Sequence, residues 1–189
     1  MTKGKWELDP FFCTVDFSVK HLAITAVKGC FHEFQANIIA DPTDMTTAEI
    51  DFTIQVNSLD TRIKDRDAHL LSPDFFDAEN YPTIEFKSKE IIKTEENNYD
   101  LIGEVAFHGV TKLETFKLKY TGHQIDPMGN FEKIAFNVSK TLKRSDFGLT
   151  IWNMPTELGA ILISDDILVE IEIQALPKEQ FAQHPVNQQ

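Results

Sequence analysis

A period of two in the apolar residues is the feature that most constrains how this chain can fold. It is clearest in 48–57, where every second residue is apolar: Ala48, Ile50, Phe52, Ile54 and Val56. Segments 99–107, 131–141 and 167–174 repeat the alternation. Because successive side chains of a strand point to opposite faces, this pattern predicts strands with one buried face and one wet face.

Turn-forming residues separate these strands. They occur at 41–44, 95–98, 108–111, 126–130 and 164–166, which indicates short connections between antiparallel neighbours. Seven or eight such strands form a sandwich or close into a barrel, since long exposed edges invite aggregation. We therefore expect an all-β fold, 1–176 as one domain and 177–189 as a polar C-terminal tail.

One stretch interrupts the strand pattern. Segment 61–71 fits a short amphipathic helix, with Asp60 placed to cap it. Segment 72–80, in which Pro73 stands in the first turn, predicts a further turn or short helix. The charges of this stretch suit a helix face with internal ion pairs.

Charge and hydropathy exclude several classes of partner. The chain has 30 acidic and 18 basic residues, a net charge of −12, which repels nucleic acid and anionic lipid surfaces. No apolar run reaches membrane-spanning length, so no stable membrane insertion is expected. The start, MTKGKWELDP, has no apolar signal region. We expect a cytoplasmic protein.

The sequence contains no motif that marks a catalytic or metal site. Asp65, Asp67 and His69 would be scattered around a helix, the other histidines show no close ligand pairing, and no cysteine pair has metal-binding spacing. Cys13 and Cys30 are expected to be reduced core thiols. We predict no metal, no cofactor and no catalytic residue.

The interior is the remaining question. The chain has 15 Phe but only 3 Tyr and 2 Trp, and Phe fills apolar volume without needing a hydrogen-bond partner. An eight-stranded barrel is just wide enough to be filled by side chains or to hold one small ligand. Periodicity alone favours the packed core.

Four motifs favour a ligand-holding barrel over a packed core. They are VKHLAITAVKGCFHEF (19–34), SLDTRIKDRDAHLLSPDFFDAENYPTIEFKS (58–88), GEVAFHGVTKLETF (103–116) and LKRSDFGL (142–149). In this order they resemble the YceI-like family of lipocalin-resembling, polyisoprenoid-binding proteins. The resemblance implies an antiparallel β-barrel of about eight strands with short helices near its mouth. It also implies a long-chain isoprenoid lipid as ligand, no catalytic activity and a homodimer.

The resemblance makes the inward face of each strand a candidate tunnel wall. The expected tunnel residues are Phe17, Phe31, Ile50, Phe52, Ile54, Phe86, Leu101, Phe107, Phe136, Val138, Val169 and Ile171. An error of one residue in the phase of a strand would turn all its side chains outward.

The candidate mouth residues come from the charged stretch and two further motifs. They are Arg62, Ile63, Arg66, Asp67, His69, Leu70, Phe75, Phe76, His108 and Arg144. We expect the apolar members, together with Leu71, to face the hydrocarbon. The polar members would contact the head-group or lock the lid, and the arginines or His108 could select a pyrophosphate. Arg144 could equally form a structural ion pair with Asp146, and 108–111 a hairpin that needs Gly109.

Two alternatives stay open. An enzyme acting on such a lipid would use His69 or His108 as base. An interaction protein with a solid core would hold no ligand.

Overall fold

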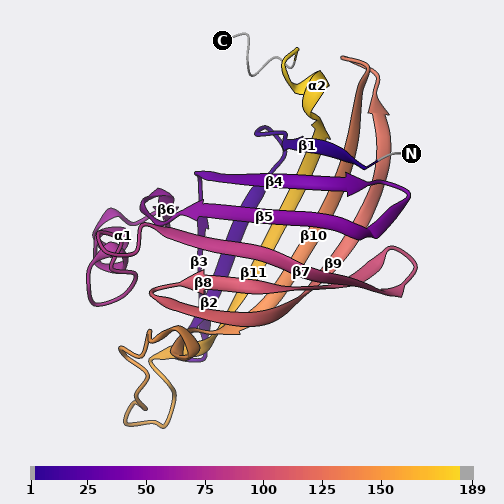
Figure 1. The fold of residues 1–189 in the computed structure, drawn as a ribbon. Helices are drawn as coiled ribbons and strands as arrows, with labels where there is room; N and C mark the ends of the chain where they lie inside the picture. Colours follow the sequence, from indigo (N-terminus) through magenta and orange to yellow (C-terminus); the bar gives the residue numbers. More distant parts are fainter. Residues whose placement is uncertain (1–2, 184–189) are drawn as a thin grey trace.

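The computed structural model describes residues 3–183, which form one twisted antiparallel sheet (Figure 1). Its strands are β1 (Gly4–Leu8), β2 (Thr14–His21), β3 (Thr25–Phe31), β4 (Phe34–Asp41), β5 (Asp44–Gln55), β6 (Leu59–Asp60), β7 (Thr83–Glu95), β8 (Asn98–Phe107), β9 (Val110–Asp126), β10 (Phe131–Lys143) and β11 (Ile163–Pro177). The helices are α1 (Lys64–Leu71) and α2 (Lys178–Phe181), with 3₁₀ turns η1 (Val56–Ser58) and η2 (Arg144–Phe147).

A pairing between β1 and β11 closes the sheet. In the order β1-β4-β5-β7-β8-β9-β10-β11 the last strand pairs again with the first, so these strands form a closed ring. The remaining part of β11 pairs with β2, which carries β3 and the short β6. The predicted antiparallel barrel of about eight strands is confirmed, and the sandwich is excluded.

Four of the five predicted turns join consecutive strands, at 41–44, 95–98, 108–111 and 126–130. At the third, His108 and Gly109 have φ of 51° and 75°, the left-handed pair that a two-residue hairpin requires. A Cβ on Gly109 would also meet the Tyr81 ring at 3.0 Å. This supports the interpretation of 108–111 as a hairpin.

The predicted turn at 164–166 is wrong, because these residues lie inside β11. The register of β11 against β2 shifts between Ile163 and Ile167. Asp165 accepts hydrogen bonds from the Ser145 N–H at 2.9 Å and the Ser145 hydroxyl at 2.7 Å. The polar run therefore makes an irregularity tied to η2 rather than a chain reversal.

The helical interruption is present but shorter than predicted. α1 begins at Lys64, after Ile63, and no side chain caps it. Asp60 does not cap α1, because its carboxylate accepts the Arg62 N–H at 2.6 Å. Segment 72–80 forms turns, with the Phe76 N–H bonded to the Leu70 carbonyl at 2.9 Å.

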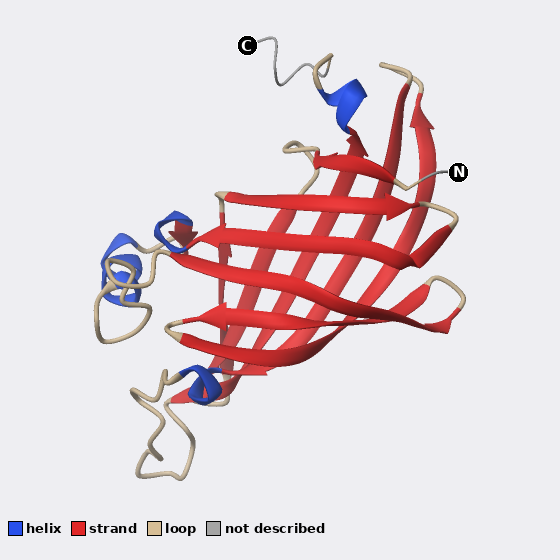
Figure 2. Ribbon diagram, viewed as in Figure 1, coloured by secondary structure: helices blue, strands red, loops and turns tan. Residues whose placement is uncertain are grey.

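The helices lie outside the barrel wall, near its two ends (Figure 2). We call α1, segment 72–80 and the loop 148–162 the lid. His69 of α1 and Phe75 each pack edge-to-face against Trp152 of the loop, with ring centroids 5.2 and 5.3 Å apart. These contacts join parts of the lid that are far apart in the sequence.

The packed end of the barrel is built around β1, and we define it by Trp6, Met45, Ile134 and Leu176, all buried. The Lys133 ammonium contacts the buried Asp9 carboxylate at 3.0 Å. Within the expected tail 177–189, the Gln180 amide oxygen accepts the Glu132 N–H at 2.7 Å, so α2 contacts the barrel. Residues 184–189 lie outside the described part.

Among residues 3–183, no helix is both long enough and apolar enough to cross a membrane.

Candidate ligand-binding site

An apolar cavity lies inside the barrel. It offers about 170 Å³ of space to the centres of water-sized molecules. Of its 26 lining residues, 23 are apolar, and the others are Asp16, Glu85 and Arg144. A cavity with such a wall gives water few hydrogen-bond partners and therefore favours an apolar occupant.

All twelve expected tunnel residues are on the wall of this cavity: Phe17, Phe31, Ile50, Phe52, Ile54, Phe86, Leu101, Phe107, Phe136, Val138, Val169 and Ile171. Their contact with a ligand stays a prediction. The wall also contains residues that sequence reasoning did not single out, including Ile38, Val105, Phe116, Leu142 and Phe147. Val105 has the same strand phase as two expected residues, so the alternation itself could have found it.

Phenylalanine dominates the wall, which accounts for the unusual composition. Nine of the chain's 15 Phe line the cavity. Phe17, Phe31, Phe76, Phe107 and Phe147 form a continuous row with successive centroid distances of 5.6, 6.2, 5.4 and 5.7 Å. Phe76 belongs to the lid, so this row connects the lid directly with the cavity wall.

The apolar lid residues divide into two groups. Phe76 lines the cavity, while Leu70 and Leu71 pack against the core. Phe75 is buried and packs edge-to-face against His69 with centroids 5.2 Å apart. Ile63 is not on the cavity wall and is 52% exposed. It precedes α1 in extended backbone, and its contact with the hydrocarbon stays a prediction.

The charged lid residues bind one another or the backbone. The Arg66 guanidinium donates to the Thr61 hydroxyl at 2.7 Å and the Thr61 carbonyl at 2.6 Å. The Asp67 carboxylate accepts the Thr61 N–H at 2.9 Å. His69 contacts Asp74 at 3.0 Å. The polar mouth residues were expected either to contact the head-group or to lock the lid, and these contacts agree with locking the lid.

Arg144 holds the loop part of the lid. It is 4% exposed, and its guanidinium donates to the carbonyls of Leu149, Ile151, Ile163 and Ser164 at 2.7 to 3.2 Å. Burial lowers the pKa of Arg144, but backbone carbonyls stabilise the cation. The predicted ion pair with Asp146 is wrong, since Asp146 contacts Lys112 at 3.0 Å instead.

The remaining mouth candidates do not border the cavity. His108 shares a 3.1 Å hydrogen bond with the Phe147 carbonyl, and its ring lies 4.7 Å from the Tyr81 ring. Arg62 has a positive φ of 69° just before α1. Neither is among the lining residues, so the structure gathers Phe76 and Arg144 at the cavity but leaves His108 and Arg62 outside it.

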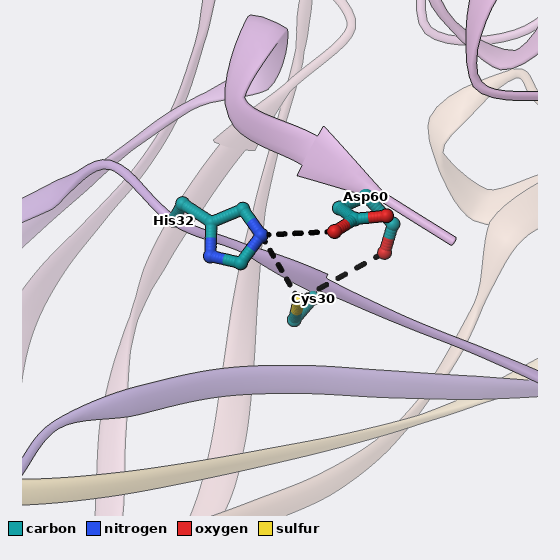
Figure 3. Close-up of side chains that lie close together, drawn as sticks. All are labelled: Cys30, His32 and Asp60. Carbon is teal, nitrogen blue, oxygen red and sulfur yellow. Dashed lines mark hydrogen bonds and ion pairs between the residues drawn. The ribbon is translucent and has the colours of Figure 1, made fainter. Parts of the chain in front are cut away.

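The two cysteines differ. Cys13 is a partly buried thiol that donates to the Gln174 carbonyl at 3.3 Å, and burial raises its pKa to about 11. Cys30 is not a core thiol, because its side chain meets His32 and Asp60 on the outside of the sheet (Figure 3). Burial, followed by the charges of Asp60 and Asp16, raises the pKa of Cys30.

This cluster corrects the statement that the histidines lack close ligand partners. The Cys30 sulfur lies 3.7 Å from His32 Nε2, which lies 3.1 Å from Asp60 Oδ2. The sequence signal that could have indicated this cluster was a cysteine followed two residues later by a histidine at the end of a strand. The third partner comes from another strand, which the sequence alone could not place.

Fold and cavity together define a closed antiparallel β-barrel with an apolar interior, the architecture of barrels that enclose one small ligand. Residues 6–175 match the YceI-like domain, and the chain belongs to this family. A UPF0312 protein of Staphylococcus epidermidis is 32% identical over 166 residues, 88% of this chain and 94% of the relative. One from Pseudomonas putida is 35% identical over 135 residues, 71% of this chain and 70% of the relative.

Solved structures agree with the fold. The Campylobacter jejuni YCEI protein is 33% identical, with a TM-score of 0.73 over 84% of this chain and 90% of its own. Burkholderia cenocepacia BcnA, at 21% identity, has a TM-score of 0.76 over 88% and 98%. A Saccharophagus degradans domain, described as polyisoprenoid-binding, has 15% identity and a TM-score of 0.65 over 91% and 98%. The last two show likeness of fold alone.

Proposed function

We propose that this protein binds one long-chain isoprenoid or related lipid in the barrel cavity, for carriage, storage or sequestration, and does not convert it. The observation that carries the proposal is the cavity wall, on which 23 of 26 residues are apolar. Family membership and the fold shared with a domain described as polyisoprenoid-binding support it.

The energetics favour an occupied cavity. By the slope of about 24 cal/mol per Å³ found for cavities left by core substitutions, a dry and empty cavity of 170 Å³ would cost about 4 kcal/mol. That is a large part of the 5 to 15 kcal/mol by which domains are typically stable. Each five-carbon unit of a bound chain contributes about 4 kcal/mol gross, at about 0.8 kcal/mol per CH₂-sized group. A few units therefore suffice for tight binding without a strong head-group site.

The cations near the cavity favour a neutral head-group, such as a quinone or an alcohol. Arg144 directs its donors to backbone carbonyls and Arg66 to Thr61. A pyrophosphate would have to break these bonds to obtain its own. A neutral head-group needs only one or two hydrogen bonds near the lid.

Binding without chemical conversion fits the composition of the wall. Asp16, Glu85 and Arg144 are the titratable residues among those that line the cavity in the described part of the chain, and Asp16 and Glu85 are exposed residues between strand neighbours that face inward. His69 and His108, the bases that an enzyme was expected to use, are bonded to Asp74 and to the Phe147 carbonyl. A cytoplasmic location and a homodimer stay predictions from the sequence.

The first test is extraction of the purified protein with organic solvent and mass spectrometry of the extract. One isoprenoid lipid per chain is the expected result and would name the head-group. An extract without lipid from protein shown to be folded, together with no binding of added prenols or quinones, would contradict the proposal.

A matched pair of variants on β11 tests the place of binding. Val169 lines the cavity, and its neighbour Leu168 points outward and is 38% exposed. Val169→Glu should abolish lipid binding, because a carboxylate cannot enter an apolar cavity without a partner. Leu168→Glu adds the same charge and should leave binding intact. Phe52→Glu and Phe107→Glu should act like Val169→Glu, and lipid retained in these folded variants would refute the cavity.

A further inference from the structure

The outer face of the barrel gathers a thiol, an imidazole and a carboxylate at one edge of the lid. Cys30, near the end of β3, and Asp60, the last residue of β6, are directly opposed in the antiparallel ladder. Directly opposed residues carry their side chains on the same face of a sheet. The neighbouring pair, Phe31 and Leu59, is buried, so Cys30 and Asp60 face outward.

His32 completes the group from the bend that follows β3, one residue after the strand ends at Phe31. Its Nε2 lies 3.7 Å from the Cys30 sulfur and 3.1 Å from Asp60 Oδ2. The close-up shows the three side chains directed toward one another (Figure 3). One ligand atom of each lies within 4.8 Å of the other two.

The geometry points to a binding site for a Zn²⁺ ion held by Cys30 Sγ, His32 Nε2 and an Asp60 carboxylate oxygen, and we propose that the protein binds zinc there. Zinc prefers thiolate, imidazole and carboxylate ligands in tetrahedral arrangement, at about 2.3, 2.0 and 2.0 Å. Such bond lengths place the ligand atoms about 3.3 to 3.6 Å apart. The separations of 3.7 Å for sulfur to nitrogen and 3.1 Å for nitrogen to oxygen need only small adjustment.

The charges around the cluster suit a divalent cation. A thiolate and a carboxylate together carry two negative charges, and Asp16 of β2 is the cross-strand partner of Cys30 on its other side. Arg62 is the nearby opposing cation. The Arg62 N–H donates to Asp60 Oδ1 at 2.6 Å, which orients the carboxylate and leaves Oδ2 directed at His32. In metal sites the ligands are usually oriented by hydrogen bonds from groups that do not themselves contact the metal.

Three protein ligands leave the fourth tetrahedral position open. His32 is exposed, so a water molecule or an anion can reach the bound ion. The site lies where β6 meets the lid, four residues before α1 begins. The β3–β6 ladder pairs only two residues on each strand, so a bound zinc would strengthen a short ladder at the base of the lid.

Zinc binding is measured by isothermal titration on reduced, untagged, metal-free protein. One Zn²⁺ per chain is expected. Cys30→Ser and His32→Gln should each weaken binding by at least about tenfold, the lower limit found for residues that only support a ligand. His69→Gln is the matched control, because His69 contacts Asp74 at a similar distance, 3.0 Å, without a thiol. Equal binding by wild type and the two cluster variants would overturn the proposal, as would equal loss in His69→Gln.

Cobalt gives an independent readout of the sulfur ligand. Co²⁺ bound to a thiolate shows an intense near-ultraviolet charge-transfer band, which the wild type and Cys13→Ser should show and Cys30→Ser should lack. A wild-type spectrum without this band would overturn the assignment of Cys30 as a ligand. Zinc should also raise the thermal midpoint of the wild type and not that of Cys30→Ser. The cluster lies on the outer face, so these results are independent of lipid binding in the cavity.

Discussion

At the packed end of the barrel, Met45, Ile134 and Leu176 are at most 1% exposed and lie outside the cavity wall, although Phe12 at this end is 56% exposed. Met154 and Leu158 of the lid loop are 58% and 98% exposed. The packed end is built from paired strands, and the lid from turns, one short helix and a loop. Elements with few buried contacts open at lower free-energy cost than paired strands. We therefore expect the proposed ligand to enter and leave through the lid.

The polar contacts of the two ends differ in the same way. At the packed end Lys133 contacts the carboxylates of Asp9 and Asp126 at 3.0 and 3.1 Å and lies over the Phe12 ring at 4.8 Å. In the lid, Arg144 binds backbone carbonyls of one loop. The first arrangement joins distant strands, and the second mainly shapes a local segment. Breaking the first should affect global stability, while a change in the lid should affect ligand exchange.

The largest expected effect is that of Lys133→Met. Removing the ammonium breaks its ion pair with the fully buried Asp9 carboxylate, and breaking a buried pair by removing one partner costs about 3 kcal/mol or more. Urea denaturation should show this loss in the free energy of unfolding. Lipid content of the folded fraction should not change, because Lys133 is outside the cavity wall.

Lys117→Met is the control for that variant. Lys117 pairs with Asp100 at 2.6 Å but is 73% exposed, and exposed pairs contribute about 0 to 1 kcal/mol. If the two variants lost the same free energy of unfolding, the ion pair at the packed end would stabilise the protein no more than an exposed surface pair.

The second effect concerns the lid. Trp152→Ala removes the ring that packs against His69 and Phe75, and each aromatic pair contributes about 0.5 to 1.5 kcal/mol. Release of a bound fluorescent lipid, followed by stopped flow, should be about tenfold faster, while the thermal midpoint changes little.

Trp152→Phe retains a ring and should release the lipid at nearly the wild-type rate. If Trp152→Ala released lipid no faster than Trp152→Phe, the ligand would not pass through the lid.

Much of the barrel could be predicted from the sequence because every second residue of a half-buried strand is apolar and faces the interior. In β5 and β11 the alternation alone gave the inward face. The turn at 164–166 was mispredicted because Ser164, Asp165 and Asp166 have the composition of a turn. What keeps them in β11 is a tertiary contact, the hydrogen bonds between Asp165 and Ser145.

The lid and the outer cluster were harder to predict because their partners are remote in sequence. The charged stretch does contain Arg66 and His69, but the packing against Trp152 joins residues about 80 positions apart. Cys30 and Asp60 meet only because β3 and β6 pair. No local pattern specifies such a pairing when one of the strands has two residues.

A smaller effect is expected from Asp165→Asn at the base of the lid loop. Burial alone would raise the pKa of Asp165, but the hydrogen bonds from Ser145 hold it below its ordinary value. Its stabilising contribution is therefore present above the unfolded pKa of about 4 and is lost as the pH falls through the folded value. The variant should lose about 1 kcal/mol at pH 7, and its stability should fall less steeply between pH 5 and pH 3, a range of about two units around that pKa.

Urea titrations at several pH values measure this difference. Asp166→Asn is the control, because Asp166 pairs with Lys143 at 3.6 Å in an exposed position. An identical acid dependence in Asp165→Asn and wild type would show that the hydrogen bonds with Ser145 do not hold the base of the lid.

The smallest expected effect tests how far a ligand reaches toward the packed end. The Tyr120 hydroxyl is buried without a hydrogen-bond partner among residues 3–183, and burial raises its pKa. Its ring packs on Phe136 of the cavity wall, with centroids 5.5 Å apart. Removing an unpaired buried hydroxyl costs little, so Tyr120→Phe should leave the free energy of unfolding unchanged or raise it by up to about 1 kcal/mol.

Lipid affinity of Tyr120→Phe then separates two arrangements of the ligand. If the head-group stays at the lid, only the chain end approaches Tyr120 and the dissociation constant should stay the same. If the head-group lies deep in the barrel and bonds the hydroxyl, affinity should fall about tenfold, the loss of one hydrogen bond of about 1.4 kcal/mol. Tyr120→Leu, which also removes the ring, should weaken both stability and binding. An affinity loss in Tyr120→Phe would therefore place the head-group deep in the barrel rather than at the lid.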